Sequence, residues 1–99
     1  MGLEAAIPIP EAGVPDWGTV REKMSSSGVP VDLKMIDGRL VLPSEIPPRE
    51  WQELRVGTAE GMITIRRRGA TLSFVVFGNA SVELVRTRDR LAAVFSGEE

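Results

Sequence analysis

The segment VDLKMIDGRLVL, residues 31–42, constrains the fold more than any other stretch of the chain. Asp37 and Gly38 lie between two alternating runs, and this dipeptide favours a two-residue type I′ hairpin because it tolerates positive φ at both positions. Pairing Ile36 with Arg39 across the turn brings the apolar side chains of both runs to one face. These side chains are Leu33, Met35, Leu40 and Leu42. The segment therefore predicts a β-hairpin with one buried face.

The second half of the chain alternates in the same way and predicts three further strands joined by tight turns. The first turn falls at 59–60 and the second at 68–69, or in a loop over 67–70, which sets Ile65 opposite Leu72. These registers place one apolar set on a single face: Leu54, Val56, Ile63, Ile65, Leu72, Phe74 and Val76. The agreement of three strands predicts an antiparallel meander.

Two helical patterns flank the strands. Asp16 is a good N-cap for a short helix that carries Trp17, Val20 and Met24 at spacings of three and four. Near the other end, Asn79 or Ser81 caps a helix of about four turns. Its apolar stripe consists of Leu84, Val85, Leu91, Ala92 and Phe95.

These elements predict an α+β two-layer sandwich. A five-stranded, mainly antiparallel meander sheet carries both the short N-terminal helix and the C-terminal helix on one face. Residues 1–14 include Pro8 and Pro10, which favour extended backbone, and are expected to form a loosely attached, proline-rich arm. Residues 15–99 are then the single α+β domain.

The residue inventory argues against an enzyme. The chain has no histidine, cysteine or tyrosine, which removes the usual general base near neutral pH, the thiol nucleophile and the commonest metal ligands. Chemistry by carboxylates alone stays formally open through Glu50 and Glu53, whereas a turn explains Asp37 and strand alternation explains Asp32. The glycines form neither a dinucleotide-binding nor a P-loop pattern. We expect no catalytic residue, no metal and no cofactor.

Three consecutive arginines, Arg66, Arg67 and Arg68, stand out within the predicted meander. The strand register sets Arg66 outward, opposite Glu53 and next to Thr71, and leaves the other two arginines in the turn. One interpretation is a solvated hairpin end. The other is a polyanion-binding surface that Arg55 extends on the same face. Aromatic side chains that would stack on bases are lacking, so nucleic acid is an unlikely partner.

Arg88 interrupts the apolar stripe of the C-terminal helix. Either its stem packs and its guanidinium reaches water, or it meets a carboxylate of a partner chain. The arginines offered for contact with a partner or a polyanion are Arg55, Arg66, Arg67, Arg68 and Arg88.

The sequence predicts a small, soluble, cytoplasmic domain without catalytic activity. Its expected role is protein interaction or self-association, with a protein partner or a homodimer. The alternative is a weak nucleic-acid or polyanion binder that uses the hairpin tip at Arg66–Arg68. No membrane partner is expected, because no apolar run approaches the ~18–20 residues that span a bilayer. The sequence points to no small-molecule substrate.

Overall fold

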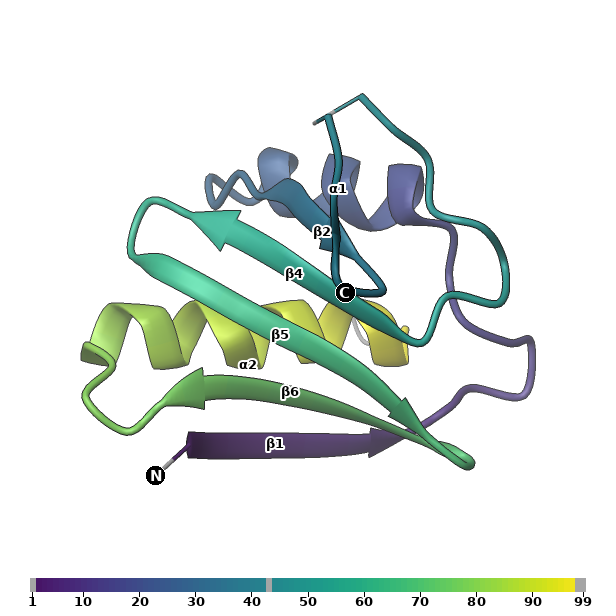
Figure 1. The fold of residues 1–99 in the computed structure, drawn as a ribbon. Helices are drawn as coiled ribbons and strands as arrows, with labels where there is room; N and C mark the ends of the chain where they lie inside the picture. Colours follow the sequence, from purple (N-terminus) through teal and green to yellow (C-terminus); the bar gives the residue numbers. More distant parts are fainter. Residues whose placement is uncertain (1, 43, 98–99) are drawn as a thin grey trace.

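A computed structural model describes residues 2–42 and 44–97. Two helices pack on one face of an antiparallel sheet, with strand order β1-β6-β5-β4-β2-β3 (Figure 1). The strands are β1 Gly2–Pro8, β2 Asp32–Ile36, β3 Arg39–Leu40, β4 Glu53–Thr58, β5 Gly61–Arg68 and β6 Thr71–Phe77, and the helices are α1 Trp17–Ser26 and α2 Val82–Ser96. The predicted α+β class is confirmed, with six strands in place of five.

The additional strand is β1, which comes from the predicted arm. Of residues 1–14, Met1 lies outside the described residues, while Gly2–Pro8 pair antiparallel with β6 along their whole length. The N–H of Ile9 donates to the carbonyl of Ala70 at 2.8 Å, and strand alternation therefore directs the backbone groups of Pro8 away from β6. Proline is compatible with an edge strand in that orientation, because its missing N–H faces solvent.

The hairpin turn at Asp37 and Gly38 is confirmed. Both residues have positive φ, 49° and 80°, as a type I′ turn requires. Ile36 pairs with Arg39, but β3 ends one residue later at Leu40. The predicted pairing of Leu33 with Leu42 is therefore wrong. The expected burial of Leu40 and Leu42 is wrong as well, since they are 78% and 71% exposed.

A β-bulge at Lys34 explains which side chains of β2 are buried. Leu33 pairs with Val56 of β4, whereas the next pair joins Met35 to Arg55, so Lys34 is the extra residue. The extra residue switches the faces, so that Leu33 and Ile36 are buried and Met35 is turned to the face opposite the helices.

The side chain of Lys34 lies over Gly57 of β4. A Cβ atom built on Gly57 would lie 2.6 Å from Cε of Lys34, so the lysine stem occupies the room that any other side chain would take. The apolar stem of Lys34 therefore covers the backbone of Gly57.

The meander agrees with the sequence in faces and differs in one register. The predicted pairing of β4 with β5 is confirmed, including Leu54 opposite Ile65. Between β5 and β6, Ile65 pairs with Phe74 rather than with Leu72. The turn is formed by Gly69 and Ala70, with positive φ at Gly69, as the first position of a type II′ turn requires. A shift of two residues leaves the same side chains on the buried face.

The helices complete the core on the apolar face of the sheet. α1 buries Trp17, Val20 and Met24, as predicted, and α2 begins after Ser81, whose hydroxyl accepts the N–H of Leu84 at 3.1 Å. The rings of Phe74 and Phe95 meet edge to face at 5.4 Å in the core. Among the described residues, no helix is long and apolar enough to cross a membrane.

Candidate interaction site

The three consecutive arginines divide between the two faces of the sheet. All three lie in β5 rather than in the turn. Arg67 follows Ile63 and Ile65 on the helix-covered face, while Arg66 and Arg68 are directed to the opposite face. The alternation that places Ile63 and Ile65 on the buried face also predicts Arg67 there. The sequence-based interpretation of Arg67 as a turn residue did not use this alternation and is wrong.

Arg66 forms the predicted cross-strand pair with Glu53. Its Nε donates to Oε2 of Glu53 at 2.9 Å, and Nε of Arg55 lies 3.8 Å from Oε1 of the same carboxylate. The neighbour of Arg66 in β6 is Ser73, not Thr71 as predicted. One carboxylate therefore lies between two guanidinium groups and offsets one of their two positive charges.

Arg67 is anchored on both sides of its guanidinium. Its Cζ lies 4.6 Å from the ring centroid of Trp51, and its Nη2 donates to the carbonyl of Arg49 at 2.6 Å. Its backbone N–H also donates to the carbonyl of Gln52 at 2.9 Å. The Arg67 guanidinium therefore stabilises this end of the sheet and is not a freely solvated group at the tip of a hairpin.

Arg88 has its carboxylate partner within its own helix. Its Nη2 and Nε lie 2.8 Å and 3.1 Å from Oδ1 of Asp89, and only 11% of its side chain is exposed. Arg68 is exposed at the end of β5. The structure therefore brings Arg55 and Arg66 together around one glutamate and places Arg67 and Arg88 elsewhere.

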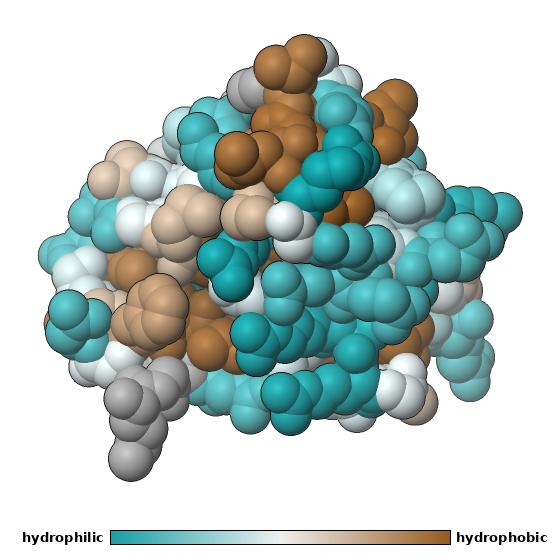
Figure 2. Space-filling view, in the orientation of Figure 1, coloured by the Kyte–Doolittle hydropathy of each residue, from teal (hydrophilic) through white to brown (hydrophobic). Residues whose placement is uncertain are grey.

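A cluster of exposed apolar side chains follows β3. Leu40, Leu42 and Ile46 are 78%, 71% and 78% exposed, and we call these three residues the β3-loop patch. Figure 2 shows brown apolar surface over this loop, at the top of the view. The patch was not predicted, because the hairpin register places Leu40 and Leu42 on the buried face and no pattern marks Ile46.

The loop that bears the patch is tied down at two points. The N–H of Val41 donates to the carbonyl of Lys34 at 3.2 Å, and the Val41 side chain packs against the core. Nη2 of Arg39 lies 2.8 Å from Oε2 of Glu45, which fixes one cation and one anion beside the patch. These contacts hold Val41 and Glu45 in place beside the apolar side chains.

The outer edge of β1 is a second exposed element. Alternation from the Ile9–Ala70 hydrogen bond directs the backbone groups of Glu4, Ala6 and Pro8 outward. Proline removes one of these donors, and a charged residue on an edge also discourages pairing. This edge is therefore partly blocked against strand addition.

The described residues hold no group of three or more histidine, cysteine, aspartate or glutamate side chains arranged to bind a metal ion. Comparison of the chain with models of protein families, with curated proteins and with solved structures finds no match.

Proposed function

We propose that this protein is a non-catalytic interaction module that self-associates through the β3-loop patch. The observation that carries the proposal is the exposure of Leu40, Leu42 and Ile46, each above 70%, at the end of β3 and in the loop after it. Burying apolar surface contributes roughly 25 cal/mol per Å², and contiguous apolar surface on a folded chain marks contact sites. Covering these side chains with another protein surface is therefore energetically favourable.

A second copy of the chain suits the patch because the charges beside it are self-complementary. A two-fold contact places the same surface of both copies face to face. Arg39 and Glu45 border the patch, so each copy can exchange its internal ion pair for one with the other copy. The net charge of −2 adds little repulsion between copies.

The outer edge of β1 supports self-association less well. Pairing two copies there must accommodate Pro8, which cannot donate a hydrogen bond, and must bring Glu4 of each copy near the new strand. We therefore assign the contact to the patch rather than to this edge.

The test is the concentration dependence of the molar mass, followed by light scattering or sedimentation. We expect the unaltered chain to move from monomer to dimer as its concentration rises through the micromolar to millimolar range. Leu40→Ser and Ile46→Ser should each weaken the dimer by about tenfold or more, because each removes apolar surface from its centre.

Val82→Ser is the matched control. Val82 is 62% exposed at the start of α2, so this change removes an equally accessible apolar side chain outside the patch. It should leave the dimer unchanged. A chain that stays monomeric throughout, or a dimer that all three serine variants weaken equally, would refute the proposal.

The alternative function is weak binding of a polyanion. Arg55, Arg66 and Arg68 share the face of the sheet opposite the helices, which supports it, but Glu53 offsets the first two. Salt-dependent retention on heparin, lost when Arg55 and Arg68 are changed to serine, would favour this function over self-association.

A further inference from the structure

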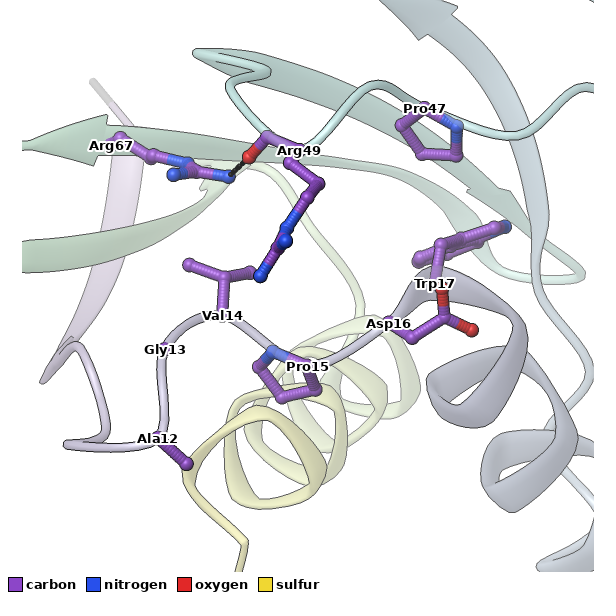
Figure 3. A pocket seen from close by; sticks show the side chains of 9 residues that line it. All are labelled: Ala12, Gly13, Val14, Pro15, Asp16, Trp17, Pro47, Arg49 and Arg67. Carbon is purple, nitrogen blue, oxygen red and sulfur yellow. Dashed lines mark hydrogen bonds between the residues drawn. The ribbon is translucent and has the colours of Figure 1, made fainter.

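A cavity of about 560 Å³ opens at the end of the core, away from the outward face of the sheet. Segment 12–17, which leads into α1, forms one wall, and Pro47 and Arg49 of the loop before β4 form the other (Figure 3). Arg67 of β5 closes the remaining side. The volume lies within the range of ~300–1,000 Å³ that is typical of small-molecule sites.

Arg67 is the unusual group in this cavity. Arg39, Arg55, Arg66 and Arg88 each have a carboxylate oxygen 2.8–3.8 Å away. Arg67 is partly buried and has no such partner among the described residues, and its Nε is buried without any hydrogen-bond acceptor. A partly buried guanidinium without a counter-ion attracts an anion, and the cavity beside Arg67 has room for one.

Arg49 brings a second guanidinium to the same space. Figure 3 shows its side chain extending from the loop into the gap between Arg67 and Trp17. The structure records no ion pair for Arg49 among the described residues, although its carbonyl oxygen fixes Nη2 of Arg67. Two cationic side chains from different elements therefore converge on one cavity, and one of them is already held in place.

The other residues that line the cavity indicate what the rest of a ligand would be like. Asp16 supplies the single carboxylate among the described residues of the lining, against the two arginines, so the lining has an excess of one positive charge. The side chain of Asp16 makes no hydrogen bond that caps α1. Val14, Pro15 and Trp17 provide apolar surface. The lining thus combines a cationic end with an apolar wall.

We infer that this cavity binds a small organic anion, a carboxylate or a phosphate monoester with a compact apolar body. Arg67 and Arg49 bind the anionic group, and guanidinium matches both carboxylate and phosphate oxygens. The apolar body of the ligand packs against Trp17 and its neighbours.

The test uses two anionic probes and one neutral probe of similar shape: benzoate, phenyl phosphate and benzyl alcohol. Trp17 and Trp51 are the two tryptophans of the chain, and both adjoin the site, so their indole N–H resonances report binding directly. We expect saturable shifts with at least one anion at millimolar concentration or below, and none with benzyl alcohol. Which anion binds tighter assigns the site to carboxylates or to phosphates.

Arg49→Gln should weaken the binding of that anion by about tenfold or more, the change in Kd that follows from losing one charged hydrogen bond. Arg68→Gln is the matched control, because Arg68 is an exposed arginine next to Arg67 that does not line the cavity. Arg67→Lys should also weaken binding, since lysine keeps the charge but loses the planar donor array.

Three results would overturn the inference. One is the absence of saturable shifts with both anions up to about 10 mM. Another is equal loss of binding in Arg49→Gln and Arg68→Gln, which would indicate diffuse attraction to surface charge. The third is equal binding of benzyl alcohol and the anions, which would indicate an apolar hollow without anion recognition.

Discussion

The guanidinium of Arg67 lies over the indole of Trp51, 4.6 Å from the ring centroid, and joins the end of β5 to the residue that precedes β4 by two positions. Trp51 is 4% exposed, so the contact is made in a largely water-free environment. Cation–π contacts of this kind contribute about 0.5–2 kcal/mol. The consecutive arginines should therefore differ sharply in their effect on stability.

Arg67→Ser should lower the free energy of unfolding by about 1–3 kcal/mol, because it removes the stacked guanidinium and its hydrogen bond to the Arg49 carbonyl. Arg68→Ser should change it by less than about 0.5 kcal/mol, since Arg68 is exposed. Urea denaturation followed by circular dichroism measures both. Equal effects of the two changes would show that Arg67 is solvated, as the sequence had suggested.

The pair of Glu53 and Arg66 should show a small coupling in a double-mutant cycle. Both side chains are partly exposed, at 26% and 41%, so solvent screening limits the coupling to roughly 0.2–1 kcal/mol. The same cycle with Arg68 in place of Arg66 serves as the control, and its coupling should be indistinguishable from zero. A coupling of similar size in both cycles would argue against a specific cross-strand pair.

Adjacent alanines in β1 offer a matched test of that strand. Alternation directs the N–H of Ala5 toward β6 and that of Ala6 outward. Ala5→Pro should therefore destabilise the fold by roughly 3 kcal/mol or more, while Ala6→Pro should cost less than about 1 kcal/mol. Thermal unfolding of the two variants measures the difference. If neither proline affects the melting temperature, residues 2–8 do not form a strand of the sheet.

Asp37 should stabilise the fold through contacts outside its turn as well as within it. Its Oδ1 accepts the N–H groups of Gln52 and Glu53, both at 2.8 Å, which fastens the hairpin to the start of β4. Asp37→Ala should cost about 2 kcal/mol, because it loses two hydrogen bonds and the tolerance for positive φ. Asp37→Asn keeps an acceptor and that tolerance, so its cost should stay below about 1 kcal/mol. Chemical denaturation distinguishes them, and equal costs would assign no role to the Oδ1 contacts.

The sequence predicted those parts of the fold that local chemistry determines. The Asp37-Gly38 dipeptide specified its own turn, and alternation assigned the buried side chains of β4, β5 and β6 correctly. The register of β6 was wrong by two residues, because alternation of period two does not distinguish such shifts. The register between β5 and β6 is determined by the two-residue turn at Gly69 and Ala70.

The features that the sequence analysis missed depend on partners far along the chain. The bulge at Lys34 lies where β2 pairs with β4, and β1 pairs with the edge of β6. The exposure of Leu40 follows from the early end of β3, which no periodicity signals. Within the candidate site, only the Arg66–Glu53 pair was predicted, since it alone follows from strand register.

The pairing of β1 with β6 also sets an order of events during synthesis. Ile7 pairs with Leu72, which is 65 positions later in the chain (72 − 7). At roughly 5–20 residues per second, a ribosome needs about 3–13 s to add that length. Throughout this interval β1 has no β6 to pair with, so β1 can join the sheet only long after it has itself been synthesised.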